Sequence, residues 1–307
     1  MEARTGAQEV LSAAVVARNA HLEAGASLLL SQVLALQSSF AWGHRFARRA
    51  RELFTREQDP DGLSDAMLTL SYLDSALGNE NLAVRAAEDA AAGAHGIARR
   101  PAAGLNYRGV AAAWGGQYCS AHGVLDAACE LAPEDAGSRA AVFQPLANAG
   151  FTEVLRCAEM RMRGHRVDLS ALSNLLARQW ALVKEGAAGS LVSGSADPGL
   201  FLLEFASCFL ASRTGDAEGA DRHYLGCLRR IPRLPETNWM QALLWWARLE
   251  RTLSAGEVLE TTVSAARLVG AAEAGEHVPM KTLARRLAAE AQANLATAPS
   301  EYATWFA

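Results

Sequence analysis

The stretch AAGLNYRGVAAAWGGQYCSAHGVLDAACELAPEDA, residues 102–136, decides the fold of this chain. Its first half contains the small residue Gly109, and Gly116 stands where a turn would divide the stretch in two. The second half carries small and aliphatic residues at helical spacing and then a proline, namely Ala121, Leu125, Ala128 and Pro133. Residues three and four positions apart lie on one face of a helix, and proline interrupts a helix interior. The stretch therefore predicts two helices that pack against each other around a turn at Gly116.

Two other stretches repeat parts of this scheme. A proline follows Gly215 at an offset of seventeen residues, just as Pro133 follows Gly116. Between Gly215 and that proline stand Ala220, Tyr224 and Cys227, and after Gly78 stand Ala83, Ala87 and Ala90. Helical spacing also covers most of the remaining chain, whereas sustained strand-like alternation is absent from it. The sequence therefore indicates an all-helical chain with internal repeats.

These units resemble the tetratricopeptide repeat family, loosely over most of the chain. The resemblance implies an all-α, right-handed α-solenoid of antiparallel helix pairs, and we expect about five to seven such hairpins. The turn glycines Gly78, Gly116, Gly164 and Gly215 lie 38, 48 and 51 residues apart. A strict array would keep about 34 residues, so longer helices or insertions are required. The alternative is a non-repetitive helical bundle whose alanine-rich helices match by chance.

We expect residues 1–307 to form a single helical repeat domain. The segment GAAGSLVSGSADPG, residues 186–199, is rich in Gly and Ser and predicts a long loop or a hinge. Another break falls at Asp59-Pro60-Asp61-Gly62, after which Ser64 or Asp65 is expected to cap the next helix.

Composition restricts the environment and the partners. The net charge of −4 lacks the basic excess that is typical of nucleic-acid binders, so direct nucleic-acid binding is disfavoured. The five cysteines form no CxxC pair, which favours reduced thiols, and no apolar stretch is long enough to cross a bilayer. We therefore expect a cytoplasmic protein without membrane contact, and a homodimer stays open.

The resemblance also implies where a partner would bind. The first helix of each pair lines the concave face of such a solenoid, and the family's offsets transfer to Tyr72, Asn106, Trp114, Phe209 and Arg213. Aromatic anchors with an asparagine and an arginine suit a protein or peptide partner. The alternative for each aromatic residue is a place in the core between helices.

We find no motif for catalysis, a cofactor or a metal. GxGxxG, Walker and HExxH motifs are absent, and Cys119, His122 and Cys129 would need a fourth zinc ligand from elsewhere. The leading hypothesis is therefore a non-catalytic protein- or peptide-binding scaffold. It would serve as the sensor or dimerisation part of a bacterial transcriptional regulator, or as a chaperone or adaptor. The alternatives are an enzyme with a pocket between helix pairs, or a small-molecule sensor built from Trp239, Trp245 and Trp246.

Overall fold

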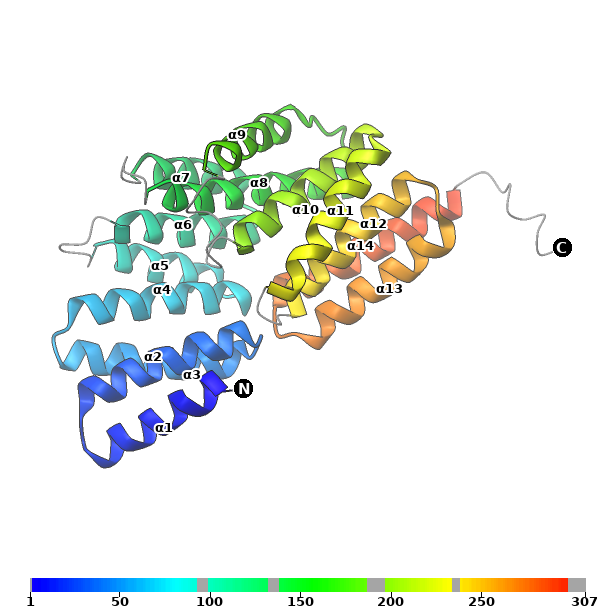
Figure 1. Ribbon diagram of the computed structural model, residues 1–307. Helices are drawn as coiled ribbons and strands as arrows, with labels where there is room; N and C mark the ends of the chain where they lie inside the picture. Colours follow the sequence, from blue (N-terminus) through cyan, green and yellow to red (C-terminus); the bar gives the residue numbers. More distant parts are fainter. Residues whose placement is uncertain (1, 93–98, 132–137, 187–196, 234–237, 298–307) are drawn as a thin grey trace.

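The chain is helical throughout the part that the computed structural model describes, which comprises residues 2–92, 99–131, 138–186, 197–233 and 238–297 (Figure 1). No strand occurs in these ranges. The helices are α1 (Glu2–Val16), α2 (Ala20–Leu36), α3 (Phe40–Arg56), α4 (Pro60–Ala76), α5 (Glu80–Ala92), α6 (Arg99–Trp114), α7 (Tyr118–Glu130), α8 (Ser138–Met162), α9 (Ser170–Gly186), α10 (Asp197–Thr214), α11 (Ala217–Arg230), α12 (Asn238–Ser254), α13 (Val258–Ala274) and α14 (Val278–Thr297), with a 3-10 turn at Ile231–Arg233. The predicted all-α class is confirmed.

The helices form a solenoid of hairpins. Each even-numbered helix from α2 to α12 packs on the odd-numbered helix that follows it, which gives six hairpins within the described residues. Each of these even-numbered helices also contacts the next even-numbered helix, so that they form one continuous inner row. The predicted solenoid of five to seven helix pairs is therefore confirmed, with α1 and α14 flanking the six hairpins (Figure 1).

Glycine makes the turn within five of the six hairpins. The backbone φ angle lies between 71° and 80° at Gly78, Gly116, Gly164, Gly215 and Gly256. A positive φ brings the Cβ of other residues too close to the backbone, and glycine has no Cβ. The turns predicted at Gly78, Gly116 and Gly215 are confirmed. In the hairpin of α2 and α3 the positive φ belongs to Ser38 instead.

The predicted start of α4 needs correction, and most of the predicted loop at residues 186–199 lies outside the described residues. Helix α4 is capped by Asp59, whose carboxylate accepts from the backbone N–H of Asp61 and Gly62, so the caps predicted at Ser64 or Asp65 are wrong. Pro60 is favourable at the first helical position because its missing N–H would have no partner there. Within the segment 186–199, residues 187–196 lie outside the described residues, and those at either end belong to α9 and α10.

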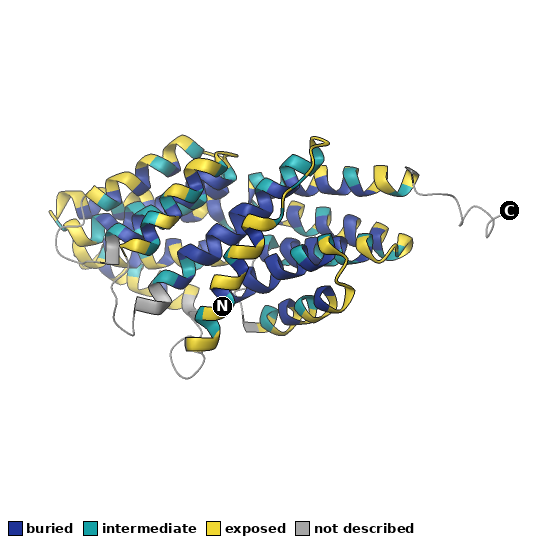
Figure 2. Ribbon diagram, turned by 90° about the horizontal axis from the view of Figure 1, so that it is seen from above, coloured by how far each residue is buried: buried dark blue, intermediate teal, exposed yellow. Residues whose placement is uncertain are grey.

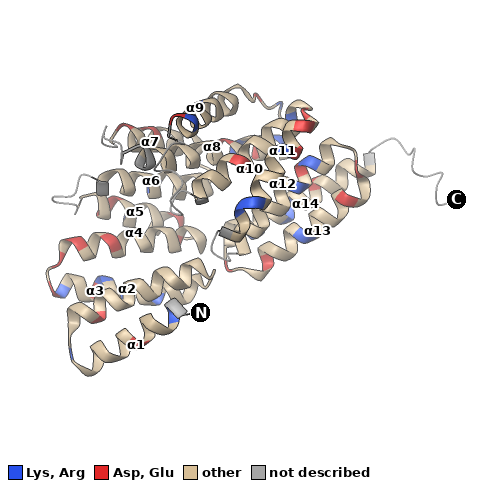
Figure 3. Cartoon of the chain, viewed as in Figure 1, with Lys and Arg blue, Asp and Glu red and all other residues tan. Residues whose placement is uncertain are grey.

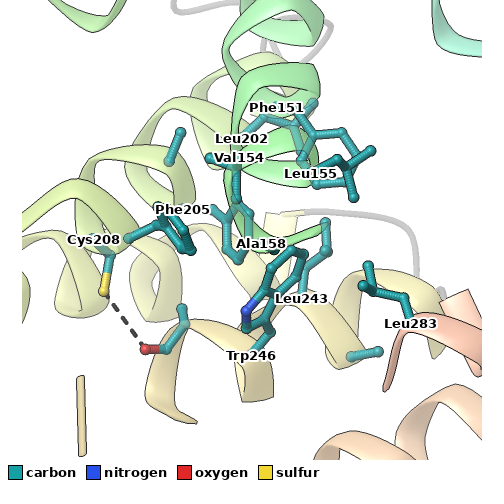
Figure 4. Close-up of a cluster of buried hydrophobic side chains, with 14 of the residues drawn as sticks. Phe151, Val154, Leu155, Ala158, Leu202, Phe205, Cys208, Leu243, Trp246 and Leu283 are labelled. Carbon is teal, nitrogen blue, oxygen red and sulfur yellow. Dashed lines mark hydrogen bonds between the residues drawn. The ribbon is translucent and has the colours of Figure 1, made fainter. Parts of the chain in front are cut away.

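The core follows the seam between the two rows of helices. Buried positions alternate with exposed ones along each helix (Figure 2), and the largest apolar cluster joins α6 to α14. Phe205 and Trp246 belong to this cluster and their ring centroids lie 5.0 Å apart (Figure 4). The five cysteines are free thiols, and no described helix combines the length and the apolar composition that crossing a bilayer requires.

Tight contact inside a hairpin depends on Gly109. A Cβ added there would lie 2.5 Å from Cγ of Leu125, a residue with no exposed surface. Overpacking costs about 1–3 kcal/mol, and alanine recovers up to about 1 kcal/mol of it through helix propensity. We therefore expect Gly109→Ala to lower the free energy of unfolding in urea by about 1–2 kcal/mol. Gly123→Ala, which meets no atom within 4 Å, is the control and should stabilise the chain slightly. Equal effects of the two variants would contradict the close packing.

Candidate functional site

A cavity of about 430 Å³ lies on the inner face of the solenoid, and we call it the inner cavity. Every hairpin contributes its even-numbered helix to the lining, and the turn before α14 adds His277. The lining residues are Gln32, Ala35, Leu36, Thr69, Tyr72, Asn106, Tyr107, Val110, Trp114, Gln144, Asn148, Phe151, Pro198, Leu202, Trp239, Met240 and His277. A cavity of this size lies within the range of ligand sites, about 300–1,000 Å³.

A chain of side-chain amides crosses the lining. Asn148 Nδ2 donates to Asn106 Oδ1 at 2.8 Å, and Gln144 Nε2 donates to Asn148 Oδ1 at 3.3 Å. Gln144 and Asn148 stand one helical turn apart on α8, whereas Asn106 comes from α6. An amide carries two donor hydrogens and two acceptor lone pairs. Each of the three amide side chains therefore keeps hydrogen-bonding capacity for the main chain of a bound peptide.

Five aromatic rings line one side of the cavity, and the buried ring of Phe40 packs behind Tyr72 and His277. We call these six residues the aromatic wall (Phe40, Tyr72, Trp114, Phe151, Trp239 and His277). The His277 ring lies at its centre, with centroid distances of 4.7 Å to Trp114, 5.7 Å to Trp239 and 5.9 Å to Phe40. Trp114 also meets Phe151 at 5.4 Å, and Phe40 meets Tyr72 at 5.9 Å. The wall thus joins α3, α4, α6, α8 and α12 to the turn before α14.

The two ends of the solenoid meet at this wall. The backbone N–H of Ala41 donates to Glu276 Oε2 at 2.8 Å, and the N–H of Asn238 donates to Ser38 Oγ at 3.1 Å. These partners are 235 and 200 positions apart in the sequence. The cavity therefore exists because the solenoid turns far enough to bring α12 and α14 to the start of α3.

Burial keeps the titratable groups of the cavity neutral. It raises the pKa of Tyr72 and of Tyr107 above the usual value, because the phenolate would lose its hydration. It lowers the pKa of His277 to about 3, since the imidazolium would be buried as well. The neutral ring accepts the backbone N–H of Met280 at Nδ1, at 3.2 Å, and so caps α14.

The structure brings three of the five sequence-predicted site residues together. Tyr72, Asn106 and Trp114 all line the inner cavity. Phe209 and Arg213 do not line it. Phe209 has 1% of its surface exposed and packs near Trp246, and Arg213 forms an ion pair with Glu250. A binding role for any of the five stays a prediction.

Several lining residues were missed at the sequence level. Gln144, Asn148 and Phe151 lie on α8, and their spacing of four and three residues places them on one helix face. That spacing was the available signal, but α8 departs from the repeat pattern in length and has Pro145 inside it. His277 gave no signal, because its neighbours in space come from distant hairpins. The structure places Trp239 in the lining, whereas the expected sensor pocket grouped it with Trp245 and Trp246.

A second pocket, of about 270 Å³, also has Trp114 in its lining. Its lining contains Glu80, Glu159 and Arg286, and the Arg286 guanidinium donates to Glu159 at 2.6 Å. Trp114 lines both spaces, so the charged pocket adjoins the inner cavity at this residue. His122, weighed above as a zinc ligand, instead pairs with Glu153 at 3.0 Å.

A solenoid with a ligand-sized inner cavity can be compared with known proteins. The fold resembles that of a Rap protein. The crystal structure of that protein in complex with competence and sporulation factor superposes with a TM-score of 0.60 and 14% identity. The likeness covers 90% of this chain and 76% of the Rap protein, and at this identity it concerns the fold. No family model and no curated protein matches the sequence, so the finer tetratricopeptide resemblance stays a prediction.

Proposed function

We propose that this chain is a non-catalytic scaffold that binds a peptide segment of a protein partner in the inner cavity. The observation that carries the proposal is the lining itself, which combines linked amides on α6 and α8 with the aromatic wall. Amides pair with the donors and acceptors of an extended main chain, and aromatic side chains supply apolar contact area. Binding on the concave face is the mode that solenoids use.

The structural neighbour supports a binding role in general terms. The Rap protein was crystallised with competence and sporulation factor, so a helical solenoid of related shape does hold a partner. By analogy we propose a regulatory or adaptor role, with the alternatives of a chaperone or the sensor part of a bacterial regulator. The proposal places the protein in the cytoplasm.

Trp114→Ala is expected to weaken partner binding at least tenfold. Buried aromatic residues at the centre of an interface contribute about 2 kcal/mol or more, and Trp114 is a half-buried ring between Phe151 and His277. The measurement is the dissociation constant of peptides selected from a random display library against the wild-type chain. Circular dichroism melting should show that the variant stays folded.

The matched control is Trp42→Ala. Trp42 lies on α3, is 56% exposed and does not line the inner cavity. Its removal should leave the dissociation constant within about twofold, as expected for an exposed residue outside the contact. Equal binding by Trp114→Ala and the wild type would refute the proposal. A Trp114→Ala chain that unfolds is replaced by Asn106→Ala, which removes one end of the amide chain.

A small-molecule sensor is the second candidate function. The specific observation is that Trp239 joins Trp114 and Tyr72 around a cavity of about 430 Å³. Native mass spectrometry of the chain purified from its own cells distinguishes the two functions. A retained small molecule that is lost in Trp114→Ala would favour the sensor, and a peptide adduct would favour the scaffold.

A further inference from the structure

We propose that the inner cavity selects a neutral, apolar segment from the interior of a longer partner chain, and keeps charged side chains and chain ends outside. This inference rests on the proposed peptide-binding function and names the class of segment that the cavity takes. It follows from the chemistry of the lining.

The lining of the inner cavity contains no acidic residue, lysine or arginine among the described residues. One residue in five of the whole chain is charged, and charged positions occur in both the N-terminal and the C-terminal halves (Figure 3). The charged residues of the described chain therefore lie outside the lining of the inner cavity. A charged ligand group would find no ionic partner in that lining.

The titratable side chains in the lining show that the cavity favours the neutral form of an ionisable group. Tyr72, Tyr107 and His277 all have their pKa shifted toward the neutral form, and burial is the first cause in each case. A ligand ammonium or carboxylate would meet the same loss of hydration. Neutral main-chain groups would not, because the linked amides of Asn106, Gln144 and Asn148 offer them both donors and acceptors.

The second pocket gives an internal comparison. It is smaller than the inner cavity and yet contains Glu80, Glu159 and Arg286. The solenoid can therefore place charge in a pocket that shares Trp114 with the inner cavity. The free ends of a short peptide carry an ammonium and a carboxylate at neutral pH. For this reason the segment that fits is internal, with both ends of its chain beyond the cavity.

The first experiment uses a display library of six randomised residues between two fixed neutral linkers, selected against the wild-type chain. We expect Asp, Glu, Lys and Arg to be depleted at least tenfold at the central positions, and aromatic or aliphatic residues to be enriched. The core tetrapeptide of the best sequence is then synthesised with acetylated and amidated ends and with free ends. The capped form should bind at least tenfold more tightly.

The second experiment changes the cavity. Asn148→Asp introduces a carboxylate beside Asn106 and should shift the enriched central residues toward Lys and Arg. The matched control Asn81→Asp makes the same chemical change in the first turn of α5, at an exposed residue outside the lining, and should keep the wild-type preference.

The outcomes separate this inference from the proposed function. Selected peptides with charged central residues, whose binding is lost in Trp114→Ala, would overturn the inference and leave the peptide-binding function standing. Equal binding of the capped and the free tetrapeptide would also overturn it. A library that yields no binder would refute the proposed function, and the inference with it.

Discussion

Replacing Glu250 with alanine is expected to lower the free energy of unfolding by about 3–5 kcal/mol. The Glu250 side chain on α12 has no exposed surface and accepts from Arg161 Nη1 on α8 at 2.9 Å. It also pairs with Arg213 on α10 and accepts the indole N–H of Trp246 at 2.9 Å. One carboxylate therefore ties three inner helices together. Its removal leaves the partly buried Arg213 guanidinium without this carboxylate and Arg161 with Glu290 alone. Breaking a buried ion pair by removing one partner is the costly case.

Urea unfolding monitored by circular dichroism measures this effect. The control is Glu257→Ala, because Glu257 also pairs with an arginine, Arg251, but is 39% exposed. Exposed pairs contribute about 0–1 kcal/mol, so this control should change stability little. Glu250→Gln keeps the shape of the side chain and removes its charge, and it should also destabilise the chain. A loss below about 1 kcal/mol in Glu250→Ala would contradict the role of this network.

The repeating fold was accessible from sequence because its determinants are local. Helical spacing of apolar residues and a glycine at the turn are both written within one hairpin, as in residues 102–136. The turns at Gly78, Gly116 and Gly215 were found for this reason. The start of α4 was misjudged because an Asp-Pro pair indicates both a break and a helix N-terminus. In the structure Asp59 is the cap and Pro60 the first helical residue.

The candidate site was accessible only in part. Tyr72, Asn106 and Trp114 lie on hairpins whose repeat pattern is clear, so the family's inner-face offsets place them in the lining. The same family offsets also predicted Phe209 and Arg213, but neither residue lines the inner cavity in the structure. On α10 these positions instead meet Trp246 and Glu250 of α12. An offset within a hairpin does not say how closely the next hairpin packs against it.

The part that no local pattern could predict is the closure of the solenoid. The aromatic wall needs Phe40 and His277, which are brought together only after six hairpins have each added a rotation. A small change in the rotation per repeat would separate them. The sequence therefore predicts the inner row of helices, whereas the volume and the wall of the cavity depend on the summed geometry of all repeats.

His277 is expected to make the stability of the chain fall in mild acid. The residue is 3% exposed in the aromatic wall, and burial lowers its folded-state pKa to about 3. The pKa of an unfolded histidine is about 6.5. Below pH 6.5 the unfolded chain therefore binds a proton that the folded chain does not. The contribution of His277 is fully present above pH 6.5 and is lost as pH falls from there toward 3.

The size of this loss of stability follows from the difference between the folded and unfolded pKa values of His277. Each pKa unit corresponds to about 1.36 kcal/mol of unfolding free energy. Between pH 7 and pH 5 the wild type should lose about 2 kcal/mol through this group. His277→Asn is the matched variant, because asparagine can cap α14 and does not titrate. Carboxylates with a lowered pKa, such as Glu159 beside Arg286, contribute equally to both proteins and cancel in the difference. Parallel curves of unfolding free energy against pH would mean that the ring reaches water in the folded chain, and that the aromatic wall does not close over it.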